Sequence, residues 1–291
     1  MKNNLKRIIL LPLLFITTLT LTGCSQDNMD NIDILVTNYP NEFVTKALYG
    51  THSTISSIYP DGVNTDNYKI NDKQKKEFAN TDLFIYNGLI EKERNLALEL
   101  LDLNKNLKII DSAYVLETDY SPEELWLNPA SLLMMSQNIH IGLEEYITNK
   151  YLQEEVTTSY EELKIKLSEL DADYRLTIEN VDNKKIIVDN SALKFLEKFG
   201  LEVTCSDASA SEKTISDIKN LIKENKVSYI FTFKDDELSE NAKNIINENQ
   251  NIKTLTLHRL DSITDKERAE EKDYITITRE NLELLKQELY Q

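Results

Sequence analysis

The chain has 291 residues, of which 33 are Lys or Arg and 50 are Asp or Glu, so its formal net charge is −17. An acidic surface repels phosphate backbones and anionic lipid, which disfavours nucleic acid as a partner. The six glycines form no Gly-x-Gly-x-x-Gly segment, and no Ser, His and Asp constellation can be assembled, which argues against an enzyme.

The first 23 residues predict an export signal. Lys2, Lys6 and Arg7 precede a short apolar run that ends in Leu-Thr-Gly-Cys at Cys24. The run is too short to remain as a membrane-spanning helix. Its end resembles the lipobox of bacterial lipoproteins, which implies cleavage before Cys24, a lipid on that cysteine and anchoring to the extracytoplasmic face of the cell membrane. The remaining chain then carries 30 basic and 50 acidic residues, a net charge of −20.

Residues 24–31 are polar and indicate a flexible tether. Strand-like and helix-like segments then alternate, because apolar β-branched runs predict strands and amphipathic runs predict helices. The predicted strands are residues 32–37, 54–59, 82–86 and 107–110, and the predicted helices are residues 41–48, 72–80 and 91–103. Residues 32–150 are therefore expected to form an N-terminal α/β lobe with a parallel sheet covered on both faces.

The middle of the chain predicts two long helices. Residues 130–174 contain no proline and one glycine, and leucines recur there at helical spacing. We place a break near Asn149 and a second helix over residues 152–181, which would be a rod of about 45 Å. Residues 151–183 are therefore assigned to a linking helix between two lobes.

The alternation of strands and helices resumes in residues 184–291, which we assign to a C-terminal α/β lobe. The predicted strands are residues 185–188, 201–204, 229–233 and 252–257, and the predicted helices are residues 191–199, 212–225, 239–249 and 278–289. The predicted fold class is α/β, with two Rossmann-like lobes whose parallel sheets are joined by a long backbone helix. A ligand cleft is expected between the lobes, where loops from the strand ends face one another.

Several segments match a known family in order and spacing. They are Tyr59-Pro60-Asp61-Gly62-Val63-Asn64-Thr65-Asp66-Asn67-Tyr68, Thr81-Asp82-Leu83-Phe84-Ile85-Tyr86-Asn87-Gly88, Leu125-Trp126-Leu127-Asn128-Pro129, Phe199-Gly200-Leu201, and Asn281-Leu282 with Leu285. Together they resemble the metal-binding lipoproteins of bacterial ABC importers, the zinc and manganese solute-binding family. The resemblance covers nearly the whole mature chain. It implies a metal site between the lobes and an ABC permease as partner. We further expect the protein to be a monomer.

The four ligand positions implied by the resemblance depart from the family pattern. Asp66 and Glu124 occupy the two histidine positions, Asn190 the third position, and Asp261 the fourth, acidic one. The family implies Mn²⁺ or Zn²⁺, but these side chains all offer oxygen, which hard cations such as Mn²⁺, Mg²⁺ and Ca²⁺ accept. Asp189 lies beside Asn190 and is a further oxygen donor. Converging carboxylates require a cation or bound protons to offset their repulsion.

The three histidines do not supply a zinc site of the ordinary kind. None of His52, His140 and His258 falls on an implied ligand position, and no His-x₃-His pair exists. Two alternatives to metal uptake therefore stay open. The cleft takes a different small ligand, or the protein has lost metal binding and acts as an adhesin or another protein-binding lipoprotein.

Overall fold

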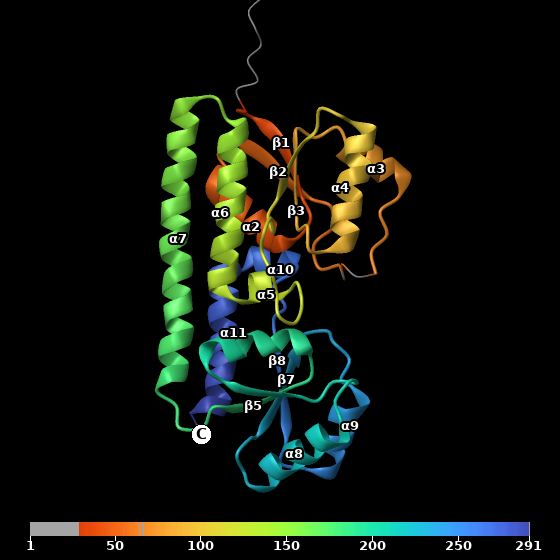
Figure 1. Cartoon of the computed structure of the whole chain (residues 1–291), viewed down its shortest axis with the longest axis vertical. Helices are drawn as coiled ribbons and strands as arrows, with labels where there is room; N and C mark the ends of the chain where they lie inside the picture. The colour runs from red at the N-terminus through yellow and green to blue at the C-terminus, as the bar shows by residue number, and fades with distance from the viewer. Residues whose placement is uncertain (1–28, 64, 66, 291) are drawn as a thin grey trace, which may run out of the picture.

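The computed structural model describes residues 29–63, 65 and 67–290. Each lobe contains a four-stranded parallel sheet, and the two sheets have equivalent strand orders, β2-β1-β3-β4 and β6-β5-β7-β8. Figure 1 shows the lobes one above the other, with long helices running along one side of both. The predicted fold class is confirmed. The domain boundaries that we drew from the sequence remain predictions.

The N-terminal lobe follows the predicted alternation closely. Its strands are buried in proportion to their apolar content, so that Leu83, Phe84 and Ile85 are fully covered while the serine-rich β2 is half-exposed. The elements are β1 (Ile32–Val36), α2 (Tyr39–Tyr49), β2 (Ser53–Ser57), α3 (Asp72–Phe78), β3 (Leu83–Tyr86), α4 (Glu91–Leu103) and β4 (Lys108–Asp111). Helices α3 and α4 pack on one face of this sheet with a core of their own.

The C-terminal lobe repeats this plan. Its elements are β5 (Lys185–Val188), the 3₁₀-helix η1 (Ser191–Phe199), β6 (Glu202–Cys205), α8 (Glu212–Lys223), β7 (Tyr229–Phe233), α9 (Glu240–Glu248), β8 (Lys253–Leu257), α10 (Asp265–Ala269) and α11 (Tyr274–Leu289). Gly200 ends η1 with φ +93°, a left-handed conformation that glycine adopts without strain. Helices α8 and α9 cover the outer face of the sheet with a separate core.

The long helix α7 (Lys150–Glu179) braces both lobes. Its 30 residues give a rod of about 45 Å, and it runs beside α6 (Pro129–Tyr146) and α11 (Figure 1). The buried stripe of α7 starts at Leu152 and ends at Ile178, and it belongs to one core that includes both Ile34 of β1 and Phe231 of β7. Because this core is shared between the sheets, the two lobes are packed as one body along the helices.

The structure differs from the predicted elements most clearly in three places. The single turn α5 (Glu124–Leu127) was not predicted, because a one-turn helix has no hydrophobic period to detect. Helix α11 begins at Tyr274, four residues before the predicted start, where Asp273 forms a capping box with Thr276. Helix α10 is not among the predicted helices.

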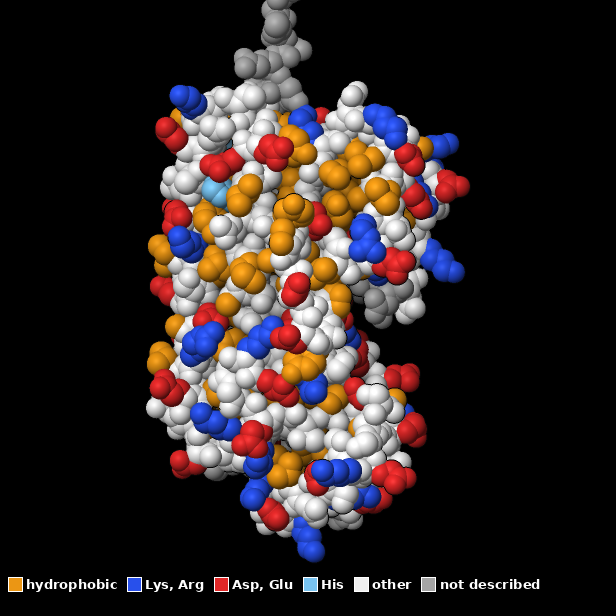
Figure 2. Space-filling view, in the orientation of Figure 1, with side chains coloured by type: hydrophobic (Ala, Val, Ile, Leu, Met, Phe, Trp, Pro, Cys, Tyr) orange, Lys and Arg blue, Asp and Glu red, His pale blue; other side chains and the backbone are white. Residues whose placement is uncertain are grey.

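On the face shown in Figure 2, acidic and basic side chains are interspersed over both lobes, and the surface is hollowed where the lobes meet. Within the described ranges, no helix is both long enough and apolar enough to cross a membrane.

Candidate functional site

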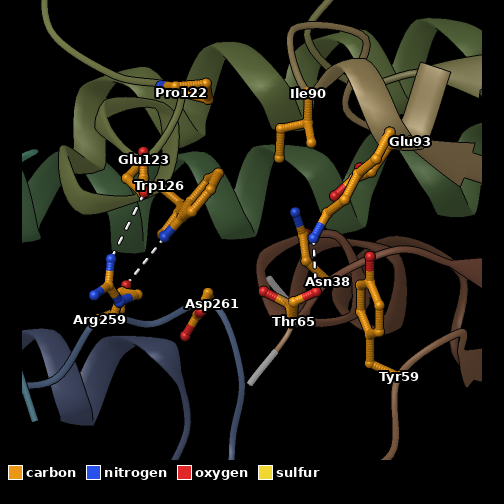
Figure 3. Close-up of a pocket in the computed structure, with 11 residues that line it drawn as sticks. Asn38, Tyr59, Thr65, Ile90, Glu93, Pro122, Glu123, Trp126, Arg259 and Asp261 are labelled. Atoms are coloured by element: carbon orange, nitrogen blue, oxygen red, sulfur yellow. Dashed lines mark hydrogen bonds and ion pairs between the residues drawn. The ribbon is translucent and has the colours of Figure 1, made fainter. Parts of the chain in front are cut away.

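A cavity of about 170 Å³ lies where the two lobes meet, beyond the carboxyl ends of the strands. Asn38 follows β1, the strand next to which the strand order of the first sheet reverses, and Asp261 lies in the loop after β8. Loops at such switch points of α/β sheets are where small ligands bind. The lining residues are Asn38, Tyr59, Thr65, Ile90, Lys92, Glu93, Pro122, Glu123, Trp126, Arg259 and Asp261 (Figure 3).

Asp261 is the predicted ligand residue that the structure places in this cavity. It also lines a neighbouring hollow of about 230 Å³ together with His258 and Arg259. Its backbone carbonyl accepts the N–H of Tyr39 at 3.1 Å, so the loop is tied directly to the start of α2 in the other lobe. The backbone of Asp261 is thus held at the lobe boundary by a contact between the lobes.

Glu124 lies outside the cavity lining, in the contact between α5 and η1. It is fully buried, and its carboxylate accepts the backbone N–H groups of Asp119, Tyr120 and Ser121. Its Oε2 is also 2.9 Å from the ammonium of Lys198, which reaches over from η1. The protein itself therefore supplies the positive countercharge that we expected a metal ion to supply at this position.

Lys198 is adapted to this role. Burial alone would lower its pKa, but hydrogen bonds to Glu124 and Asp119 outweigh burial and raise the pKa. The lysine therefore keeps its positive charge at neutral pH, and its pair with Glu124 joins the two lobes.

Asn190 and Asp189 are both engaged in the C-terminal lobe. Asn190 caps η1 by accepting the N–H of Ala192 at 2.9 Å, and its amide donates to Asp236 at 3.0 Å. Asp189 is buried and accepts hydrogen bonds from the Ser206 hydroxyl and from the hydroxyl and N–H of Ser239. Neither residue lines the cavity.

Asp66 and Cys24 lie outside the described residues, so the structure gives no position for either. Thr65, the neighbour of Asp66, lines the cavity. Within the part of the chain that the structure describes, no group of three or more His, Cys, Asp or Glu side chains is arranged to hold a metal ion. Of the three predicted ligands that the structure describes, Asp261 lines the cavity and Glu124 and Asn190 do not.

Arg259 is the central residue of the cavity that the sequence reasoning missed. Its guanidinium pairs with Asp236, lies 3.7 Å from Glu123 and stacks 4.5 Å from the ring centre of Phe233. Its carbonyl accepts the Trp126 indole N–H at 3.0 Å, as Figure 3 shows. The signal for it in the sequence is its position two residues before the predicted ligand Asp261.

Glu93 is the second missed residue. It is 2% exposed, and its Oε2 accepts the Thr37 hydroxyl and the Asn87 N–H. Burial raises the pKa of Glu93 to about 7, with the hydrogen bonds from Thr37 and Asn87 acting in the opposite direction. Its carboxyl group therefore exchanges a proton near neutral pH inside the cavity wall. A glutamate in the first turn of an amphipathic helix is an ordinary surface pattern, so the sequence offered no signal for it.

The histidines have structural partners. His52 lies between Asp30 and Glu155, at 3.1 and 2.8 Å. His140 stacks on Tyr160 with 4.6 Å between ring centres. His258 accepts the N–H of Leu260 at 2.9 Å, and burial lowers its pKa.

Comparisons with known proteins place the whole described fold in one group. The sequence profile of the family described as "Zinc-uptake complex component A periplasmic" matches residues 34–288. The zinc-binding lipoprotein AdcA of Streptococcus pneumoniae is 24% identical over 311 aligned positions, covering 97% of this chain and 61% of that protein. The high-affinity zinc uptake system protein ZnuA of Bacillus subtilis is 23% identical, covering 92% and 90%. This chain thus spans about three fifths of the length of the first of these relatives.

Solved structures agree on the fold. The Zn(II)-bound ZnuA-like domain of Streptococcus pneumoniae AdcA aligns with a TM-score of 0.72 and 23% identity, covering 90% of this chain and all of that one. The laminin-binding protein Lbp of Streptococcus pyogenes aligns with a TM-score of 0.72 and 21% identity, covering 89% and 99%.

Proposed function

Because the chain belongs to the family of zinc-uptake complex component A, we propose that it is the extracytoplasmic binding component of an ABC importer. Its cargo is a divalent metal ion, which it captures between the lobes and delivers to a membrane permease. The sequence of residues 1–24 supports secretion and anchoring through a lipid on Cys24. Capture without chemistry fits the absence of a recognisable catalytic constellation from the sequence.

The observation that carries the proposal is the position of Asp261. Its carboxylate belongs to a loop of one lobe that is hydrogen-bonded to the other, and it lines a cavity at the strand ends. Thr65 lines the same cavity, and Asp66, which directly follows it in the sequence, is proposed as the second oxygen ligand. Oxygen ligands favour Mn²⁺, Mg²⁺ or Ca²⁺ on chemical grounds, while the family favours Zn²⁺.

Glu124 and Asn190 complete the proposed ligand set only if they exchange their present partners. Glu124 would have to leave Lys198, and Asn190 would have to leave Asp236. Lys198 lies across the contact between α5 and η1, whereas Asp236 belongs to the same lobe as Asn190, so metal binding would replace one ion pair and one hydrogen bond. This makes Asp66 and Asp261 the first residues to test.

The test is calorimetric titration of the metal-free mature chain with Zn²⁺, Mn²⁺, Ca²⁺ and Mg²⁺. We expect Asp261→Asn and Asp66→Asn each to weaken binding at least tenfold, about 1.4 kcal/mol. Asp217→Asn, an exposed position on α8, is the matched control and should bind as the wild type does. Absence of heat with every metal would remove the metal from the proposal.

The alternative of a protein-binding lipoprotein makes a different prediction for the same preparation. A ligand that binds only the folded state raises the unfolding temperature. Thermal unfolding that neither metal nor chelator shifts would favour the alternative.

A further inference from the structure

The interlobe cavity contains a feature that a metal ion cannot use. Asn38 lines this cavity, and it is one of the described residues that have a buried side-chain atom without a hydrogen-bond partner. Asn38 is 4% exposed, and its Nδ2 is the unpartnered atom. Leaving a buried N–H donor unsatisfied costs about 1–3 kcal/mol, so such an atom calls for an acceptor.

The orientation of this amide is fixed. The Asn38 Oδ1 accepts the N–H of Asn41 at 3.1 Å and so caps helix α2. The nitrogen must therefore be the atom that faces the other way, and Figure 3 shows it directed toward the space bordered by Ile90, Glu93 and Trp126. An N–H donor attracts an oxygen that carries negative charge and repels a cation.

We propose that this cavity binds a small molecule bearing a carboxylate, whose oxygens accept from the Asn38 amide and are attracted by Lys92 and Arg259. This ligand is additional to the metal ion of the proposed function, and the inference does not require that ion.

The charges around the cavity support a carboxylate on the Asn38 side. Lys92 and Arg259 both line the cavity, and the Lys92 ammonium is held by the carbonyl of Thr65 at 2.6 Å. Asn38 also stands at the N-terminus of the eleven-residue helix α2, which adds positive potential. Burial raises the pKa of Glu93 to about 7, so its carboxyl is about half protonated at neutral pH and largely protonated below it, and it then repels an anion less.

The remaining charges suit the rest of such a ligand or a metal ion beside it. Glu123 and Asp261 place two carboxylates in the same lining, while Ile90 and Trp126 offer apolar surface (Figure 3). A lining with both positive and negative side chains is complementary to a zwitterionic ligand, or to an anion bound together with a cation. A volume of about 170 Å³ corresponds to about six water molecules, which limits the ligand to a molecule of about the size of lactate or alanine.

Asn38→Asp isolates the donor. Aspartate keeps the capping oxygen and is as good an N-cap as asparagine, but it replaces the N–H₂ with a second oxygen. Asn71→Asp is the matched control, because Asn71 caps α3 in the same way through the N–H of Gln74 and is exposed. Lys92→Gln, at an exposed position, gives a second variant that does not touch a cap.

The experiment is calorimetric titration of the mature chain with lactate, alanine and 1,2-propanediol, once metal-free and once with Zn²⁺. We expect lactate or alanine to bind the wild type and Asn71→Asp, at least tenfold more weakly to Asn38→Asp, and several-fold more weakly to Lys92→Gln. Propanediol, which lacks the carboxylate, should give no heat. Alanine binding without lactate identifies a zwitterion, and lactate binding identifies a plain carboxylate.

The inference is overturned if neither carboxylate binds in either arm, or if Asn38→Asp binds them as the wild type does. The metal titrations are read separately. Metal binding without carboxylate binding leaves the proposed function intact and removes this inference. Carboxylate binding without metal binding supports this inference and removes the metal from the proposed function.

Discussion

Two buried glutamates of the N-terminal lobe, Glu124 and Glu93, differ in how the protein compensates their charge. Glu124 accepts three backbone N–H groups and faces the ammonium of Lys198. Glu93 is similarly buried, but its carboxylate accepts from one hydroxyl and one backbone N–H, and burial raises its pKa to about 7. The comparison teaches that burial of a carboxylate does not by itself indicate a ligand site, because the partners decide whether its charge is already compensated.

The comparison also locates where the cleft can respond to a ligand. The Glu124 contact joins α5 to η1 through a charge pair and holds the two lobes together. The Glu93 side has a carboxyl group that titrates near neutral pH, next to the amide of Asn38. Ligand-dependent changes are therefore expected on the Glu93 side, and mechanical coupling of the lobes on the Glu124 side.

Glu93→Gln should produce the largest effect, because it removes a buried charge and keeps the acceptor for Thr37 and Asn87. The folded-state pKa of Glu93 is raised above the unfolded value of 4.5, so the folded state holds the proton more tightly. Wild-type stability should fall as pH rises from about 4.5 to about 7, by at most about 3 kcal/mol from this group. The variant should lack that loss, so its advantage in urea unfolding grows across this window.

Glu91→Gln serves as the control, because Glu91 is exposed in the first turn of the same helix. Its difference from the wild type should not change between pH 4.5 and pH 8. An equal response of the two variants would mean that Glu93 ionises as a surface carboxylate does.

Lys198→Met tests the other glutamate. The change removes the ammonium that lies 2.9 Å from Glu124 and leaves a buried carboxylate with its backbone donors. We expect a loss of about 2 kcal/mol in the free energy of unfolding, less than for a fully buried pair because Lys198 is one-third exposed. Adding Glu124→Gln to Lys198→Met should restore most of the loss.

Lys219→Met provides the comparison for this experiment. Lys219 pairs with Glu248 at 2.6 Å between two exposed side chains of α8 and α9. Such a pair contributes less than about 1 kcal/mol. Similar losses for the two lysine variants would show that Glu124 is not held by its charge partner.

The fold was predictable from the sequence because buried parallel strands are continuous apolar runs. The segments around Leu83–Tyr86 and Tyr229–Phe233 were placed almost to the residue. The strand β2 was predicted to continue to residue 59, because Ile58 and Tyr59 are apolar. Both residues are buried, but they lie beyond the last residue pair that joins β2 to β1. Hydrophobic pattern reports burial, and only backbone pairing decides where a strand ends.

The site was predictable only in part, because its chemistry depends on partners that are distant in the sequence. The family resemblance led to Asp261, which lines the cavity. The pairing of Glu124 with Lys198 joins residues 74 positions apart (198 minus 124), and no local pattern announces it. The same holds for Arg259, whose partners Glu123 and Trp126 come from the other lobe.

Tyr120→Phe should produce the smallest effect. It measures how much the hydrogen bond at the solvent-exposed edge of the Glu124 contact contributes to stability. The Tyr120 hydroxyl donates to Glu197 of η1, and this hydrogen bond, followed by burial, raises the pKa of Tyr120 to about 12. Phenylalanine removes the hydroxyl alone, while the backbone N–H of residue 120 still donates to Glu124. We expect a loss of about 0.5 kcal/mol in urea unfolding, because Tyr120 is exposed and Glu197 is partly exposed.

Tyr114→Phe is the control, because Tyr114 is 67% exposed in the same lobe, and it should leave stability unchanged. If Tyr120→Phe lost as much stability as Lys198→Met, the exposed hydrogen bond of Tyr120 would stabilise the contact between the lobes as much as the buried charge pair does. A loss within error of the control would confine this stabilisation to Glu124 and Lys198, where the low local dielectric makes each hydrogen bond stronger.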